Sequence, residues 1–135
     1  MLLEVNHEDY DIEYAIAKTC GKQYSIIDRI IKKNFGSFRY QLLGVSKNKF
    51  NINFEEYNNT VYLNFDLRVK GIVFYFRYKN TEYVEFCPYH SLTFQSNDSS
   101  FIVQTDIYTY NFEIMNTSKH KDFILKLYDF INKKI

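Results

Sequence analysis

The chain has 135 residues, of which 46% are hydrophobic and 24% charged, and its formal net charge is +1. This length fits one domain, and the hydrophobic content suffices for one packed core. The near-zero net charge does not indicate a nucleic-acid binder or a protein drawn to an anionic membrane surface, so we expect neither as a partner.

The N-terminal residues and the cysteines bear on the cellular compartment. Residues 1–9 contain no basic segment followed by a long apolar stretch, so no signal peptide is predicted. No run of about 18 apolar residues predicts a membrane-spanning helix. Cys20 and Cys87 are too few for a disulfide scaffold and are interpreted as buried free thiols. The sequence therefore predicts a cytoplasmic protein.

Two helices are predicted in the N-terminal part, where apolar residues recur at helical spacing over residues 9–34. The first stripe is Ile12, Ala15, Ile16 and Cys20, and the second is Ile26, Ile27, Ile30 and Ile31. Gly21 predicts a break between them, and Gly36 predicts the stop of the second helix. We therefore assign residues 1–35 to a helical N-terminal extension and residues 36–135 to the main domain.

After Gly36 the apolar residues recur with a period of two, which is typical of antiparallel strands with one face on a core. The alternating segments are residues 39–45, 50–54, 61–67, 72–76, 84–86, 92–94, 101–103 and 112–114. Turn-forming residues such as Asn, Gly and Ser separate these segments. About seven short strands are predicted.

The chain ends in a predicted amphipathic helix. Ser118 is the candidate N-cap, and the apolar stripe is Phe123, Leu127, Phe130 and Ile131. So narrow a stripe needs a surface to cover, and the open end or open face of the preceding sheet is the one available.

Two short segments carry a resemblance to a known family. Residues 70–76 (KGIVFYF) and residues 88–92 (PYHSL) resemble the "Gly-Ile, strand, Pro-Tyr-x-x-Leu" pattern of small bacterial pleckstrin-homology-like (PH-like) proteins. The resemblance covers roughly residues 38–133 and implies a mainly β fold, a partly open antiparallel barrel with a C-terminal capping helix. The alternative is an unrelated α+β sheet with helices packed on one face.

Cys87 and His90 are the most conspicuous pair of reactive side chains. A structural zinc site needs four ligands, and the remaining candidates, Cys20, His7 and His120, have no matching spacing. A Cys–His nucleophile needs a third group to orient the base, and no local pattern supplies one. We predict no metal, no cofactor and no catalytic residue, and hence no enzyme.

The carboxylates are scattered and are expected to solvate the exterior of the sheet. They are Glu55, Glu56, Glu82, Glu85, Asp98 and Asp106. The resemblance implies a lipid-headgroup site in the first strand–strand loop, where Lys47 and Lys49 lie. The basic pair expected to follow them is missing, so we do not expect membrane-lipid binding.

The sequence favours a non-enzymatic protein-interaction or scaffold module with a protein partner, because it contains no catalytic set and the resembled fold commonly serves recognition. An open barrel also has an edge strand able to accept a peptide. Tyrosine is a favoured interface residue, and the candidate partner-binding residues are Tyr62, Tyr75, Tyr83, Lys47 and Lys49. Two alternatives stay open: a small-ligand or lipid-headgroup binding barrel, and a homodimer formed through the N-terminal helices.

Overall fold

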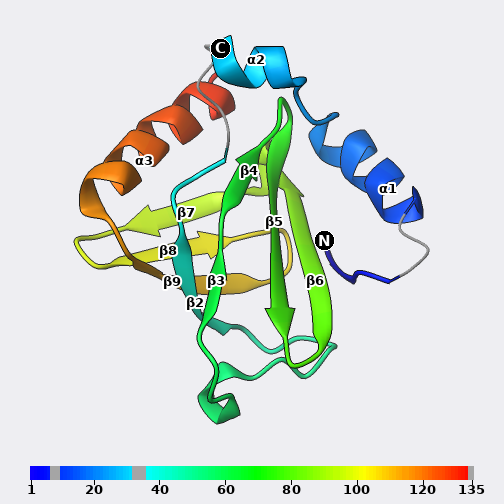
Figure 1. The fold of residues 1–135 in the computed structure, drawn as a ribbon, viewed down its shortest axis with the longest axis vertical. Helices are drawn as coiled ribbons and strands as arrows, with labels where there is room; N and C mark the ends of the chain where they lie inside the picture. Colours follow the sequence, from blue (N-terminus) through cyan, green and yellow to red (C-terminus); the bar gives the residue numbers. More distant parts are fainter. Residues whose placement is uncertain (7–9, 32–35, 134–135) are drawn as a thin grey trace.

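The strands form two antiparallel sheets in the computed structural model, which describes residues 1–6, 10–31 and 36–133. The first sheet has the order β1-β6-β5-β4, formed by Leu2–Glu4, Thr81–Pro88, Gly71–Tyr78 and Phe65–Leu67. The second has the order β3-β2-β9-β8-β7, formed by Val61–Leu63, Tyr40–Val45, Thr109–Ile114, Ser100–Gln104 and Thr93–Ser96. The predicted mainly β fold is confirmed, and the two described sheets do not close into a barrel (Figure 1).

Three α-helices flank these sheets: α1 (Tyr10–Cys20), α2 (Ile26–Ile31) and α3 (Thr117–Ile131). Two short 3₁₀ turns are η1 (Phe54–Glu56) and η2 (Tyr89–Ser91). Gly21 has a φ of 93°, a left-handed value that favours glycine, and the predicted break at this residue is confirmed. The predicted helical positions 9 and 32–34 lie outside the described residues.

The N-cap of α3 is Asn116, so the prediction of Ser118 is wrong. The Asn116 side-chain oxygen accepts a hydrogen bond of 3.0 Å from the backbone N–H of Lys119. Its extended backbone places this oxygen over the first turn, as N-capping requires. Ser118 lies inside that turn, where its hydroxyl donates to the Asn116 side chain.

The segment 61–67, predicted as one strand, is divided between the two sheets. Val61–Leu63 pairs with β2, whereas Phe65–Leu67 pairs with β5. The chain passes from one sheet to the other at Asn64, whose side-chain amide donates to the carbonyl of Ser37 at 2.6 Å. This crossing joins the two sheets along one edge.

Residues 50–54, predicted as a strand, form a loop that leads into η1 instead. Asn51 has a φ of 58°, which is incompatible with an extended strand. The side chain of Asn48 organises the loop, because its oxygen accepts from the backbone N–H groups of Phe50 and Ile52. These side-chain bonds replace the ladder bonds of a strand.

An aromatic core fills the space between the sheets and under α3. The ring centroid of Phe65 lies 5.1 Å from those of Tyr40 and Phe74 and 5.0 Å from that of Phe112. From α3, Phe123 stacks on Phe65 at 5.4 Å. The other buried residues of the predicted α3 stripe are Leu127 and Phe130. The predicted C-terminal helix and its covering role are confirmed.

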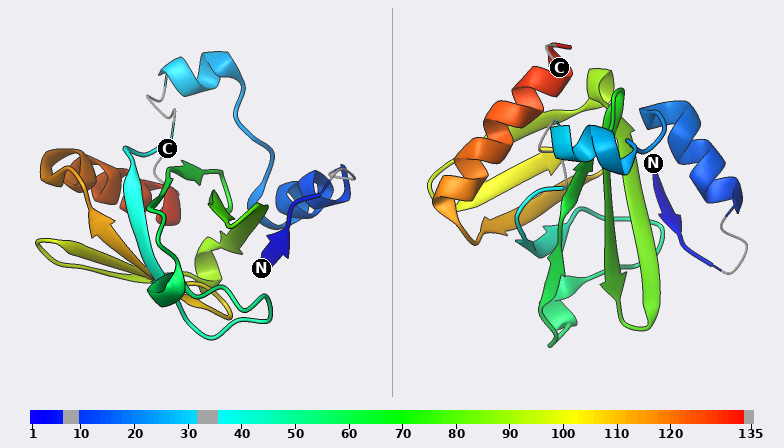
Figure 2. Two further views of the ribbon diagram at one scale, coloured as in Figure 1. Left: turned by 60° about the horizontal axis from the view of Figure 1, so that its bottom comes forward. Right: turned by 45° about the horizontal axis from the view of Figure 1, so that its top comes forward.

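Most of β6, and β5 at Val73, are buried on both faces, which the alternation of the sequence did not predict. Their inner residues pack in the main core, whereas Val73, Val84 and Phe86 face outward. On that outer face they contact Ile16 and Cys20 of α1. Helix α1 therefore lies against the outside of the first sheet, beside β6 (Figures 1 and 2).

The residues at the N-terminal end of the chain also belong to a sheet. The sequence analysis assigns them to a helical extension, but Leu2–Glu4 forms β1 and pairs antiparallel with β6, Leu2 opposite Glu85. Leu2 is buried in the main core. The division of the chain at residue 35 stays a prediction. None of the helices in the described part of the chain is long and apolar enough to cross a bilayer.

Candidate functional site

The candidate partner-binding tyrosines differ in accessibility. Tyr62 and Tyr75 are exposed on the outer faces of β3 and β5, and the guanidinium of Arg39 lies 4.3 Å from the centre of the Tyr62 ring. Tyr83, the third candidate tyrosine, is only 7% exposed, so its side chain is not accessible on the surface as a partner-binding residue requires. It faces the main core, where its ring stacks on that of Phe76 at 5.7 Å.

Lys47 and Lys49 are exposed in the loop that follows β2. Lys47 lines a hollow of about 470 Å³ together with Lys79, Glu55 and Glu56. Since two lysines and two glutamates share its wall, this hollow has no net excess of either charge among its described ionisable residues. It gives no electrostatic preference for an anionic lipid headgroup.

The structure places Cys87 and His90, the conspicuous pair in the sequence, in different surroundings. Cys87 is fully buried in the main core, and burial raises the pKa of its thiol to about 11. His90 is exposed on η2, where its ring lies 3.1 Å from the hydroxyl of Ser91. Among the described residues, no group of three or more His, Cys, Asp or Glu is arranged to hold a metal ion; His7 lies outside them.

Glu85, expected on the exterior, is fully buried on the inner face of β6. Burial raises the pKa of its carboxyl group, while the amino group of Met1 and the phenol of Tyr110 oppose this shift. The phenol donates to one carboxylate oxygen at 2.7 Å, and the amino group to the other at 2.6 Å. The prediction fails because both faces of β6 are covered.

His120 forms a buried hydrogen-bonded group that the sequence analysis missed. Its Nδ1 lies 2.5 Å from the phenol oxygen of Tyr40, and its Nε2 lies 2.6 Å from the hydroxyl of Ser96. Burial lowers the pKa of His120 and raises that of Tyr40, so both are neutral at pH 7. The position of His120, three residues before Phe123 on the apolar stripe, was the pattern that could have revealed its burial.

Ser96 and His120 are placed like a serine nucleophile and its base, but the hydrogen bond between them runs from His120 to Ser96. A buried phenol needs an acceptor, and Nδ1 is the one within reach, so we assign the phenol as the donor to Nδ1. Nε2 then carries the imidazole proton and donates to Ser96. In this tautomer His120 cannot accept a proton from Ser96, and the group connects α3 to β2 and β7.

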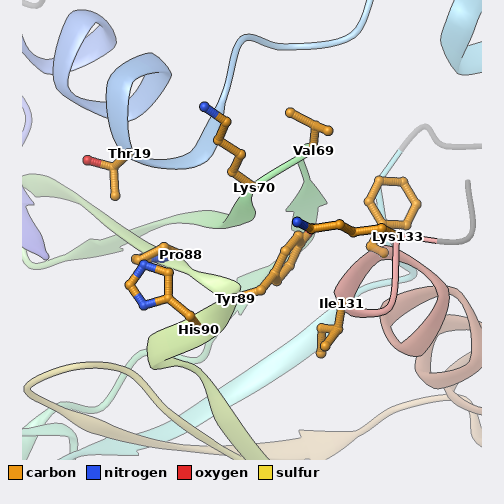
Figure 3. Close-up of a pocket in the computed structure, with 9 residues that line it drawn as sticks. Thr19, Val69, Lys70, Pro88, Tyr89, His90, Ile131 and Lys133 are labelled. Atoms are coloured by element: carbon orange, nitrogen blue, oxygen red, sulfur yellow. The ribbon is translucent and has the colours of Figure 1, made fainter.

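A pocket of about 410 Å³ lies where four parts of the chain meet: the end of α1, the β4–β5 turn, η2 and the end of α3 (Figure 3). Its apolar walls are formed by Val69, Pro88, Tyr89, Phe130 and Ile131. Its polar residues are Thr19, Lys70, His90 and Lys133. The segment containing Pro88 and His90, which stood out in the sequence, therefore lines a pocket formed with residues from both ends of the chain.

Helix α2 exposes three isoleucines and turns a polar residue toward the rest of the fold. Ile26, Ile27 and Ile30 are 72%, 69% and 59% exposed. Arg29 is half-buried, and its guanidinium lies 3.8 Å from the carboxylate of Asp66 on β4. This orientation is the reverse of the usual one for a surface helix. Figure 2 shows α2 projecting from the rest of the fold.

No protein-family model, no curated protein and no solved structure matches this chain. The resemblance to PH-like proteins therefore rests on the two sequence segments and on the order of strands followed by one helix.

Proposed function

We propose that this chain is a non-enzymatic protein-interaction module and that helix α2 is its contact surface. The observation that carries the proposal is the outward orientation of Ile26, Ile27 and Ile30. Exposed side chains of this size cost free energy in water, and burying each of them in an interface recovers about 1.5–3 kcal/mol. A contiguous group of them on one helix indicates a surface that a partner covers.

The ion pair between Arg29 and Asp66 supports this interpretation. It holds the polar side of α2 against β4 and so directs the isoleucines away from the core. The side chain of Arg29 is only 23% exposed and that of Asp66 25%, so the pair is partly shielded from water. The ion pair thus connects α2 to β4 while Ile26, Ile27 and Ile30 stay accessible.

The size of this surface favours a different protein over a second copy. A stable interface buries roughly 800 Å² on each partner, more than three isoleucine side chains can supply. Two α2 helices packed on each other would fall short of this area. A groove on a partner can enclose the helix from several sides, which is the helix-in-groove mode of recognition.

The finer fold assignment belongs to the same proposal. We propose that residues 38–133 are a PH-like domain in which the two sheets stay separate. The order of a run of antiparallel strands followed by one covering helix supports this, as do the KGIVFYF and PYHSL segments. A protein-recognition role agrees with this fold by analogy only.

The test is affinity purification of the tagged protein from its native cells with quantitative mass spectrometry. The variant Ile26→Ser/Ile27→Ser/Ile30→Ser is compared with wild type and with a control, Ile107→Ser/Leu125→Ser, at residues that are equally exposed elsewhere. We expect one stoichiometric protein that wild type and control retain and the α2 variant loses.

Three other results would contradict this assignment. A partner retained by the α2 variant but lost by Tyr62→Ala/Tyr75→Ala would place the contact on the strand faces. A dimer of this chain, seen by light scattering and lost in the α2 variant, would replace the partner by a second copy. Purification of wild type alone as a monomer would remove the interaction proposal.

A further inference from the structure

We propose that the pocket between α1, the β4–β5 turn, η2 and the end of α3 binds a small organic anion. The ligand we infer has an apolar body and one carboxylate or phosphate group. This site is independent of the α2 surface. It is assigned from the framework of the pocket, its charge and its walls.

The framework of the pocket is fixed by backbone hydrogen bonds. The N–H of Lys70 donates to the carbonyl of Cys20 at 2.9 Å, which ties the β4–β5 turn to the end of α1. The N–H of Tyr89 donates to the carbonyl of Lys70 at 2.9 Å, which ties η2 to the same turn. The phenol of Tyr89 donates to the carbonyl of Arg68 at 2.6 Å. Such preorganisation lowers the cost of ligand binding.

The described lining of the pocket contains three basic residues, Lys70, His90 and Lys133, and no Asp or Glu. Among the described residues, neither lysine forms an ion pair with a carboxylate. The carboxylates of Glu13 and Asp66, which lie on neighbouring elements, contact arginines instead. Within the described part of the chain, no carboxylate thus competes with an external anion for these two ammonium groups.

Backbone hydrogen bonds close the last turn of both helices that end beside the pocket. At the end of α3, the N–H groups of Asn132 and Lys133 donate to the carbonyls of Tyr128 and Phe130. At the end of α1, the N–H of Gly21 donates to the carbonyl of Ala17 at 2.9 Å. Backbone N–H groups therefore already occupy these three carbonyls.

The walls of the pocket are the reason for inferring that the ligand has an apolar body. Val69, Pro88, Phe130 and Ile131 present apolar surface, and the ring of Tyr89 belongs to the same lining (Figure 3). The phenol of Tyr89 already donates within the chain, so its ring contributes apolar surface. Thr19 adds one hydroxyl at the α1 side. A volume of about 410 Å³ is in the usual range for small-molecule sites.

The test uses 4-phenylbutyrate and phenyl phosphate as probes, with 4-phenylbutyramide as the uncharged control. Binding is followed by amide chemical shifts in two-dimensional NMR titrations. We expect both anions to shift the amides of Lys70, Tyr89 and His90 and the amide to shift them little. We expect Lys70→Ala/Lys133→Ala to weaken binding about tenfold or more.

Matched variants separate a charge effect from loss of folding. Lys70→Arg/Lys133→Arg keeps the charges and should keep binding, and Lys47→Ala/Lys49→Ala removes two distant lysines and should leave affinity unchanged. The α2 serine variant should also bind normally, so failure of the two proposals can be told apart.

Equal shifts with the uncharged amide, or undiminished affinity in Lys70→Ala/Lys133→Ala, would overturn the proposal. So would binding to phosphatidylserine vesicles with no response to either soluble anion. Absence of shifts with both anions at millimolar concentration would overturn it as well.

Discussion

The Nδ1 atom of His120 lies 2.5 Å from the phenol oxygen of Tyr40 in the core. The same ring reaches Ser96 on the edge strand β7, so one side chain of α3 contacts both an inner and an edge strand of the second sheet. This hydrogen-bonded group fixes the position of α3 over the aromatic core.

Stability is predicted to fall in mildly acidic solution because of His120. Burial lowers its pKa from the ordinary value of 6.5, so the unfolded chain binds a proton at a pH where the folded chain does not. Its contribution is fully present above about pH 6.5 and is lost as the pH falls from there through the folded pKa. Urea unfolding at several pH values measures this.

The variant His120→Gln should lack this part of the pH dependence, whereas His90→Gln, at an exposed histidine, should retain it. The variant has to be compared with wild type because Glu85 changes the free energy of unfolding with pH in the direction opposite to His120. Its raised pKa makes its contribution fall as the pH rises from 4.5. An unfolding free energy with the same pH slope in His120→Gln and wild type would contradict the prediction.

Gly71→Ala should destabilise the fold by about 1–3 kcal/mol, the usual cost of overpacking a core. A Cβ at this position would lie 2.5 Å from both the sulfur of Cys20 and the backbone carbonyl oxygen of Cys87. Gly44→Ala is the control, because a Cβ there meets no atom within 4 Å. Chemical denaturation should show a loss for Gly71→Ala only, and equal effects would disprove the packing argument.

Truncation of two isoleucines on the N-terminal helices should change the free energy of unfolding by very different amounts. Ile16→Ala on α1 should cost about 2–5 kcal/mol, because Ile16 is fully buried against β5 and β6. Ile27→Ala on α2 should change the free energy of unfolding by less than about 0.5 kcal/mol, because its side chain is exposed. Thermal and urea unfolding of the isolated chain check both values. A large loss in Ile27→Ala would show that α2 packs within the chain.

Tyr110→Phe should cost about 1–3 kcal/mol, because it removes a donor from the buried carboxylate of Glu85. Tyr75→Phe, at an exposed position, is the matched control and should be nearly neutral. Urea unfolding at neutral pH compares them. Equal stability of both variants would mean that the Tyr110 bond contributes nothing net.

Two of the failed sequence predictions concern places where side-chain hydrogen bonds or a chain crossing override a local pattern. Residues 50–54 alternate as a strand does, yet the bonds of Asn48 and the left-handed backbone of Asn51 form a loop. Residues 61–67 also alternate throughout, but the chain changes sheets at Asn64. Alternation records which residues face the same way and does not record which strand lies alongside.

The sequence by itself determined the mainly β fold, the break at Gly21 and the covering role of α3, because periods of 2 and 3.6 residues follow directly from backbone geometry. Tertiary structure alone decided that β6 is covered on both faces, which buries Tyr83 and Glu85. It also decided that Ile26, Ile27 and Ile30 of α2 face outward and that Lys70 and Lys133 line one pocket. These outcomes depend on which distant segments pack together, and residue spacing along the chain carries no information about that.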